Sequence, residues 1–272
     1  MSHDATGLRR RTFLAGAAAA GVVTAVAAPA AAAASPGGPK PTIVLVHGAF
    51  ADASGWNDVV HRLLCEGYPV IAPANPLRGI AADSASLASL LAALEGPLVL
   101  VGHSYGGVVI TNAATGNPRV KALVYIAAFA PDDGDTVGGL QNMFPGTKLG
   151  LDALDLRPIT LPDGTPSHDG YVKKAVFRDV FAGDLPPATT AVMAATQRPA
   201  NVRSLQELSG PPAWRTIPSW FLVARDDQLI PAAAQRYMAR RAGSRVVEVR
   251  SSHVAMMSRP AQTAAIVLAA AR

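Results

Sequence analysis

The hydrophobic pattern of this chain alternates between continuous apolar runs and segments with helical spacing. The runs are too short for helices and predict strands at 42–46, 68–71, 98–101, 122–127, 220–224 and 246–249. Helices are predicted between them, at about 52–67, 83–94, 107–114, 232–241 and 261–271. Strands that are apolar on both faces and alternate with helices are typical of a parallel sheet covered on both sides. We therefore expect an α/β fold.

One long segment breaks this alternation. Between Pro131 and about Arg215 the chain is rich in Pro, Gly and Asp, with large apolar residues scattered among them. Functional sites gather at the carboxyl edge of a parallel sheet, and a long insertion there usually covers one. We predict a lid at about 131–215, inserted before the strand 220–224.

The N-terminal segment predicts an export signal of the twin-arginine type. Residues 8–14 read LRRRTFL, and an alanine-rich apolar stretch follows them. A membrane anchor is the alternative, but alanine is weakly hydrophobic, and Gly16, Gly21 and Pro29 interrupt the stretch.

These features suggest a processed protein. We expect an export signal at 1–34, a Pro- and Gly-rich linker at 35–41 and one domain at 42–272. Such a domain would be secreted or extracytoplasmic, and without a stable membrane anchor once the signal is cleaved.

Composition narrows the class of function. Hydrophobic residues make up 50% of the chain and charged residues 16%, which is typical of a globular protein with a large core. The formal charge of +5 is too small to suggest nucleic-acid binding. The single cysteine, Cys65, lies in an apolar helical stretch, so we expect a buried, inert thiol and neither a disulfide nor a zinc site within one chain.

The clearest chemical motif is Gly102-His103-Ser104-Tyr105-Gly106. It follows the predicted strand 98–101 and precedes a predicted helix, which is the setting that a G-x-S-x-G nucleophile motif requires. The chain must turn sharply there with the serine at the apex, so bulkier flanking side chains would clash with the backbone. We predict that Ser104 is a nucleophile.

A serine nucleophile needs a base and an acid, which follow it in the order serine, acid, histidine in this kind of fold. Of the six histidines, His253 alone lies beyond a strand that could carry the acid after the lid. His47 is better interpreted as shaping the backbone near the nucleophile. His61 is expected on a helix surface and His168 in solvent.

The acid is expected just after the strand 220–224, where Asp226 and Asp227 stand side by side. Their distance in sequence from the strand does not show which of the two is the acid. A less favoured set of candidates for the acid follows the preceding strand and consists of Asp132, Asp133 and Asp135. A buried carboxylate would fix the tautomer of His253 and stabilise its protonated form.

Two backbone amides are expected to stabilise the oxyanion. The amide of Tyr105 stands at the start of the helix behind Ser104, where N–H groups lack helical partners. The second donor should be the amide of Ala49, after the first strand, with Phe50 as the alternative.

The segments VLVHGAF, LVGHSYGG, VYIAAFAPD, ARDDQLIP and SSHVAMMSRP resemble the α/β-hydrolase superfamily, in particular its plant methyl-ester esterases, hydroxynitrile lyases and their bacterial relatives. The resemblance spans about Thr42 to the C-terminus. It implies an α/β-hydrolase fold, a helical lid, no cofactor and no metal. It also selects Asp227 over Asp226, because the acid of that branch precedes an x-x-Ile-Pro stretch, and it supports Ala49 as oxyanion donor.

Two positions favour hydrolysis over lyase activity. The resembling lyases carry a lysine directly after the catalytic histidine and a threonine after the first-strand histidine, where this chain has Val254 and Gly48. We therefore predict a serine carboxylic-ester hydrolase that acts through an acyl-enzyme. A hydroxynitrile-lyase-type enzyme and a small-molecule receptor without turnover are the alternatives.

The substrate is expected to be a small or medium ester with an apolar or aromatic acyl group. Large apolar side chains near the predicted site suggest an apolar pocket. The predicted pocket residues are Phe50, Phe129, Met143, Phe144 and Phe181.

Overall fold

The computed structural model describes residues 38–161 and 163–272. The predicted export signal at 1–34 and the first linker residues, 35–37, lie outside the described residues. Residues 38–272 form one compact unit, and within it no helix is long and apolar enough to cross a membrane.

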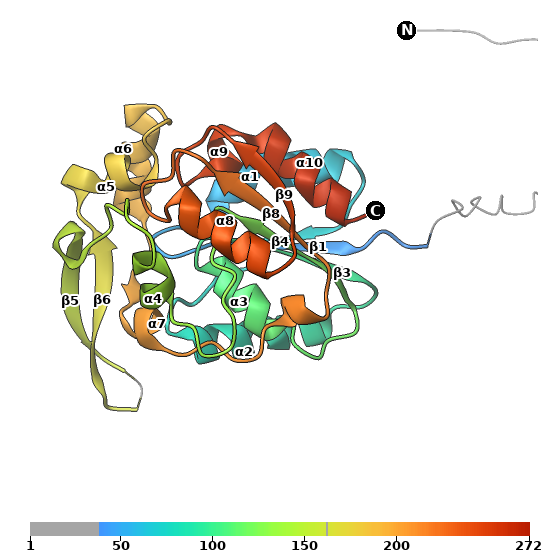
Figure 1. The fold of residues 1–272 in the computed structure, drawn as a ribbon, viewed down its shortest axis with the longest axis horizontal. Coiled ribbons are helices and arrows are strands. Elements are labelled where there is room, and N and C mark those ends of the chain that lie inside the picture. The colour runs from blue at the N-terminus through green and yellow to red at the C-terminus, as the bar shows by residue number, and fades with distance from the viewer. Residues whose placement is uncertain (1–37, 162) are drawn as a thin grey trace, which may run out of the picture. The chain divides into compact units, whose positions relative to one another are not determined.

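A six-stranded parallel sheet forms the centre of the domain (Figure 1). Its strand order is β2-β1-β3-β4-β8-β9, so the chain starts near one edge of the sheet, crosses to the other and places β3 and β4 in the middle. The strands are β1 (Thr42–Val46), β2 (Val70–Ile71), β3 (Leu98–His103), β4 (Val120–Ile126), β8 (Ser219–Ala224) and β9 (Arg245–Val249). The predicted α/β architecture with a parallel sheet is confirmed.

Helices cover both faces of the sheet. In Figure 1, α2 and α3 lie below the sheet, and α1 and α10 lie above it. The helices of this part are η1 (Ala53–Trp56), α1 (Asn57–Cys65), α2 (Ile80–Ala93), α3 (Gly106–Ala113), α8 (Ala232–Arg241), α9 (Ala255–Ser258) and α10 (Pro260–Ala270). Every residue of β3 is buried, which matches its continuous apolar run.

The edges of the sheet and the first helix differ from the prediction. β2 has two residues where four were expected, and the apolar Val246 and Val247 of the edge strand β9 are 44% and 45% exposed. In α1, Val59 and Leu63 are buried, but Leu64 is 54% exposed. Cys65 is also exposed, so the expectation of a buried thiol is wrong. Both residues lie beyond the stripe that faces the core, since α1 packs through one narrow face.

The segment predicted as a lid has its own secondary structure. Its helices are α4 (Val137–Asn142), η2 (Leu151–Ala153), α5 (Lys174–Phe181), α6 (Pro187–Thr196), α7 (Arg203–Gln206) and η3 (Ala213–Arg215). They accompany an antiparallel sheet of β5 (Leu154–Thr160), β6 (Pro166–Val172) and β7 (Ala200–Asn201). The expected helical lid is therefore mixed, and Figure 1 shows its elements gathered at one end of the parallel sheet.

Candidate active site

Ser104 lies at the sharp turn between β3 and α3. Its φ angle is 54°, in the left-handed region that few residues other than glycine adopt. The turn is possible because the backbone packs closely around it: a Cβ on Gly102 would lie 2.6 Å from the carbonyl carbon of Gly106. The motif thus forms a strained elbow that presents the serine at the carboxyl edge of the sheet.

Asp227 follows β8 and is held by four hydrogen bonds. Its Oδ1 accepts from the amides of Leu229 (2.8 Å) and Ile230 (3.0 Å). Its Oδ2 accepts from Gln235 Nε2 (2.8 Å) and from His253 Nδ1 (2.7 Å). Because the carboxylate is buried and fully bonded, its oxygens have one fixed arrangement, with Oδ2 turned toward the histidine.

His253 lies in the loop after β9 and is completely buried. A carboxylate can only accept, so the bond to Asp227 places the proton of the neutral ring on Nδ1 and leaves Nε2 free to take a proton. Nε2 is buried and has no hydrogen-bond partner among the described residues. It is available for the serine hydroxyl, a contact that tightens when substrate binds.

The other candidate acids lie elsewhere. Asp226 is exposed and faces Arg250 at 3.8 Å. Asp132 pairs with Arg215, and Asp135 pairs with Arg241 at 2.6 Å. Asp227 is thus the candidate that the structure places against His253.

His103, inside the G-x-S-x-G motif, holds the loop of His253. Its Nε2 donates to the carbonyl oxygen of His253 at 2.9 Å, and the two rings lie 4.7 Å apart. Burial, together with the nearby charge of His253 when protonated, lowers the pKa of His103 well below its usual value. His103 is therefore a neutral positioning group, and sequence reasoning assigned it no role.

Asp184, from the lid, holds the same loop from the other side. Its carboxylate accepts from the amide of Ser252 (3.0 Å), next to His253, and from the Ser252 hydroxyl. Burial raises the pKa of Asp184, but its hydrogen bonds, chiefly those from Ser252, outweigh this effect and the pKa is lowered. Asp184 is thus ionised at neutral pH and connects the lid to the loop of His253.

The predicted oxyanion donors lie on both sides of Ser104. Ala49, Tyr105 and Ser104 line the same pocket, and neither amide bonds to another backbone carbonyl within the described residues. Phe50, the alternative donor, has a φ angle of 59°, so the chain turns sharply after Ala49. Two free amides beside a nucleophile can stabilise a developing oxyanion.

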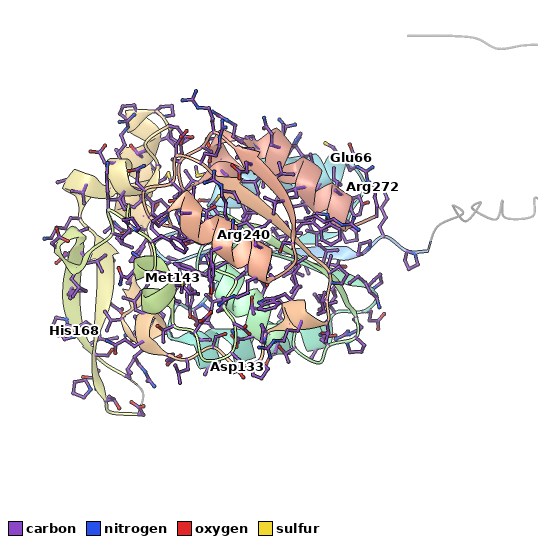
Figure 2. The ribbon with its side chains drawn as sticks, in the orientation of Figure 1. Glu66, Asp133, Met143, His168, Arg240 and Arg272 are labelled. Carbon is purple, nitrogen blue, oxygen red and sulfur yellow. The ribbon has the colours of Figure 1, made fainter. Side chains whose placement is uncertain are left out.

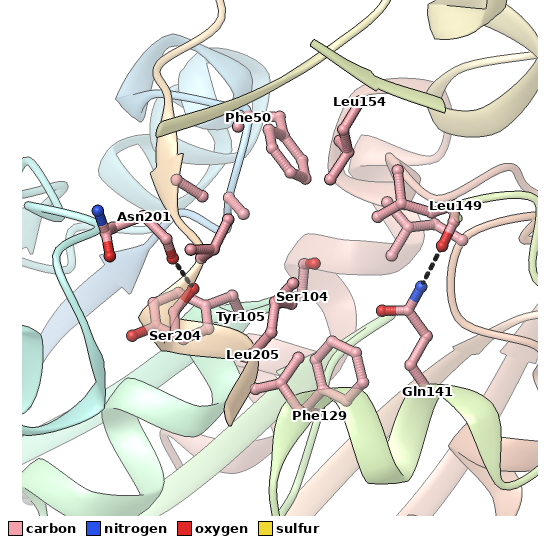
Figure 3. A pocket seen from close by; sticks show the side chains of 16 residues that line it. Phe50, Ser104, Tyr105, Phe129, Gln141, Leu149, Leu154, Asn201, Ser204 and Leu205 are labelled. Atoms are coloured by element: carbon pink, nitrogen blue, oxygen red, sulfur yellow. Dashed lines mark hydrogen bonds between the residues drawn. The ribbon is translucent and has the colours of Figure 1, made fainter. Parts of the chain in front are cut away.

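The pocket at Ser104 has about 480 Å³ of empty space, part of which is open to solvent (Figure 3). Of the predicted pocket residues, Phe50 and Phe129 line it. Phe181 instead packs against the His253 ring at 5.1 Å and lines a second pocket of about 350 Å³. Phe144 packs on Tyr237, so it does not reach the pocket.

Met143, the remaining predicted pocket residue, is 47% exposed. Figure 2 labels Met143 beside α4 and His168 on β6, toward the outer side of the lid. The pocket is lined instead by smaller apolar side chains of the lid, among them Val137, Leu149 and Leu154. The expected role of Met143 and Phe144 is wrong, because Met143 is exposed, Phe144 packs against Tyr237 and neither side chain lines the pocket.

The hydroxyl of Tyr105 is bonded to a buried carboxylate and is not free to bind a substrate. Its hydroxyl donates to Asp83 Oδ2 at 2.8 Å, and Asp83 also accepts from the amides of Arg78 and Gly79. Asp83 is fully buried, and this burial raises its pKa, an effect that the bonds from Arg78 and Tyr105 partly offset. Tyr105 thus stabilises the chain behind the nucleophile through its hydroxyl.

Tyr105→Phe is expected to lower the free energy of unfolding by about 1–3 kcal/mol, because the buried Asp83 carboxylate loses a donor. Losing the donor raises the folded-state pKa of Asp83 further. The loss in free energy of unfolding should therefore be complete above the folded-state pKa of Asp83 in the variant. It should shrink as the pH falls through that pKa. Urea unfolding of both proteins from neutral to acidic pH measures this. Turnover should change little, since the backbone amide of residue 105 remains. Inactivity as complete as that of Ser104→Ala would contradict a structural role for the Tyr105 hydroxyl.

No group of three or more His, Cys, Asp or Glu side chains that could hold a metal ion occurs among the described residues. The site consists of a serine, a histidine, a carboxylate and two free amides, which together suit acyl transfer.

A family model described as "Alpha/beta hydrolase family" matches residues 43–266. The chain belongs to this family. It is 30% identical over 254 residues to a pyrethroid hydrolase of Sphingobium wenxiniae, a match that covers 82% of this chain and 84% of the relative. The family predicted from the sequence is confirmed.

Solved structures agree with the fold of this α/β-hydrolase. Polyneuridine aldehyde esterase has a TM-score of 0.73 at 19% identity, and the match covers 85% of this chain and 98% of the other. A methylesterase from Arabidopsis has a TM-score of 0.70 at 22% identity, covering 85% and 98%. Both likenesses therefore support the fold of the domain.

Proposed function

We propose that this α/β-hydrolase is a serine carboxylic-ester hydrolase that acts through an acyl-enzyme on Ser104. One observation carries the proposal most directly: Asp227 fixes His253 with Nε2 unpartnered, at the end of the sheet where Ser104 lines an apolar pocket. Relatives named pyrethroid hydrolase and carbendazim hydrolyzing esterase agree with a carboxylesterase-type enzyme, the class predicted from the sequence.

The geometry supports a two-step reaction. Ser104 Oγ attacks the ester carbonyl as its proton passes to His253 Nε2, and the amides of Ala49 and Tyr105 stabilise the oxyanion. The tetrahedral intermediate collapses, and the alcohol leaves with the proton from His253. Water then gives a proton to His253 and attacks the acyl-enzyme, which releases the acid and restores Ser104.

The pocket supports a small or medium apolar or aromatic acyl group. Most of its lining is aliphatic or aromatic, with Phe50 and Phe129 on either side of Ser104 in Figure 3. An apolar acyl group gains free energy on leaving water for such a pocket, at about 25 cal/mol per Å² of buried apolar surface.

Lyase activity is disfavoured by the space around Gly48. A Cβ at this position would lie 2.6 Å from Ser104 Cβ and 2.8 Å from the carbonyl oxygen of His103. The threonine of the resembling lyases would therefore force the backbone away from the nucleophile. Val254, in the place of the lyases' lysine, is fully buried and offers no charge.

The proposal is tested with purified protein starting at Ser35 and chromogenic esters that differ in acyl length and in aryl substitution. We expect many turnovers per enzyme on short and aromatic acyl esters. A cyanohydrin and a panel of non-hydrolysable ester analogues are run beside them. Cyanohydrin cleavage without ester hydrolysis would favour the lyase, and binding without any turnover would favour a receptor.

We also propose that the protein is exported, on the basis of the LRRRTFL segment and the alanine-rich stretch after it. Expression of the full chain in a bacterium with a twin-arginine pathway tests this. The mature protein should appear outside the cytoplasm, and Arg9, Arg10 and Arg11 replaced by lysine should retain it in the cytoplasm.

A further inference from the structure

The pocket at Ser104 contains few polar side chains. They belong to Ser104, Tyr105, Gln141, Asn201 and Ser204. The Tyr105 hydroxyl is bonded to Asp83, and Ser204 donates to the carbonyl oxygen of Asn201 at 2.7 Å.

Asn201 is occupied as well. Its Oδ1 accepts from Ser167 and from the amide of Arg203, and its Nδ2 donates to His168 and Asp169. Of the five polar side chains, those of Ser104 and Gln141 therefore remain for a substrate.

The Gln141 amide has one fixed orientation. Its Nε2 donates to the carbonyl oxygen of Leu149 at 2.9 Å, an atom that can only accept. Nε2 also donates to Thr147 Oγ1 at 3.2 Å, and that hydroxyl gives its own proton to the carbonyl oxygen of Leu229 at 2.9 Å. A flipped amide would set its oxygen against the Leu149 oxygen, so Oε1 must lie on the other side.

Oε1 is an acceptor held ready in an apolar cavity. Gln141 is 6% exposed, and its Oε1 has no hydrogen-bond partner within residues 38–161 and 163–272. Figure 3 shows this oxygen directed into the pocket, on the side where Ser104 lies. A donor on the substrate can bond to this oxygen, and such a hydrogen bond inside an apolar pocket contributes to binding.

We propose that Gln141 selects esters whose acyl group is mainly apolar but carries one hydrogen-bond donor, a hydroxyl or an N–H. This inference rests on the proposed ester hydrolysis. It assigns a specificity-determining role to Gln141, whose amide orientation is fixed by the carbonyl oxygen of Leu149.

The donor belongs on the acyl side of the ester. The alcohol leaves with a proton from His253. Phe181 and Val254, which neighbour His253, line the second pocket, and Phe50 lines both pockets. Gln141 lines the first pocket together with Ala49 and Tyr105, the proposed oxyanion donors. The acyl group therefore extends from Ser104 toward Gln141.

The test uses 4-nitrophenyl phenylacetate and derivatives with a hydroxyl or a fluorine at the ortho, meta or para position of the acyl ring. Fluorine cannot donate a hydrogen bond. We expect kcat/KM to favour the hydroxyl over the fluorine about tenfold at one ring position or more. In Gln141→Met, the same ratio should fall to about one, and comparing variants on the same two esters cancels their intrinsic reactivity.

Thr147→Val is the matched control. It also removes a hydrogen bond of this network but keeps the Gln141 oxygen and its bond partner Leu149, so most of the preference should remain. If Gln141→Met does not fold, Gln141→Asn withdraws the oxygen by one carbon and should lower the ratio as well. A wild-type enzyme that favours the hydroxyl at no ring position, or a preference that persists in the folded Gln141 variants, would overturn the inference.

The two proposals fail differently. If unsubstituted 4-nitrophenyl phenylacetate and the other esters are not hydrolysed, the ester hydrolase itself is refuted. If that ester is hydrolysed through Ser104 without any preference for a hydroxyl, the role of Gln141 alone is refuted.

Discussion

Ser104→Ala is expected to lower kcat/KM for a good ester by about 10⁵-fold, the scale of loss when a serine nucleophile is removed. The hydroxyl makes no hydrogen bond within the described part of the chain, so its removal should leave the fold intact. Steady-state kinetics on the best chromogenic ester measures the loss, and circular dichroism checks the fold.

Ser84→Ala is the matched control for this variant. Ser84 lies in α2, is 9% exposed, and its hydroxyl also lacks a partner among the described residues. The change should leave kcat/KM within about twofold of the wild type, as expected for substitutions away from the site. If Ser104→Ala keeps more than a tenth of the activity, another group is the nucleophile.

Asp227→Asn is expected to lower kcat by about 10⁴-fold with little change in the fold. The oxygen of asparagine can still accept from the amides of Leu229 and Ile230. Its NH₂ would then face Gln235 and His253, where only an acceptor fits, so His253 would adopt the wrong tautomer. Measurement of kcat at saturating ester tests the prediction.

Asp226→Asn makes the same chemical change one residue earlier. Its side chain is 56% exposed and lies 3.8 Å from Arg250, so activity should stay near that of the wild type. The reverse pattern, with Asp226→Asn inactive and Asp227→Asn active, would show that the acid is Asp226 and contradict the assignment of Asp227.

The parallel sheet was predictable because its inner strands carry their signal locally. β3 is a continuous apolar run, and burial on both faces is what such a run predicts. The antiparallel sheet of the lid was not predictable, because its strands lack such a local signal. In β5 the apolar alternation covers only Leu154 to Arg157 and ends at Pro158, and β6 reads PSHDGYV, which has no such alternation.

The candidate triad was predictable in part. The order of residues along the chain singled out Ser104 and His253, but the spacing of the two adjacent aspartates did not distinguish them, and only the resemblance to a family selected Asp227. What distinguishes Asp227 is its set of donors from Leu229, Ile230 and Gln235, which exist only after β8 and α8 have formed.

The supporting residues carry no local signal at all. Asp184 lies 68 residues from Ser252, and His103 lies 150 residues from the carbonyl that it bonds. Gln141 resembles any polar residue of a short helix until the bonds to Thr147 and Leu149 fix its amide. Such roles follow from tertiary contacts, which the order of residues does not encode locally.

Covalent labelling with a fluorophosphonate tests the central claim, a nucleophilic Ser104, most directly. Peptide mass analysis should find one phosphonyl group per chain, on Ser104, and ester turnover should fall in proportion to the labelled fraction. His253→Ala should label far more slowly, because Ser104 then lacks its base. Full turnover in a chain labelled completely at Ser104, or inactivation with the label on a different residue, would contradict the account.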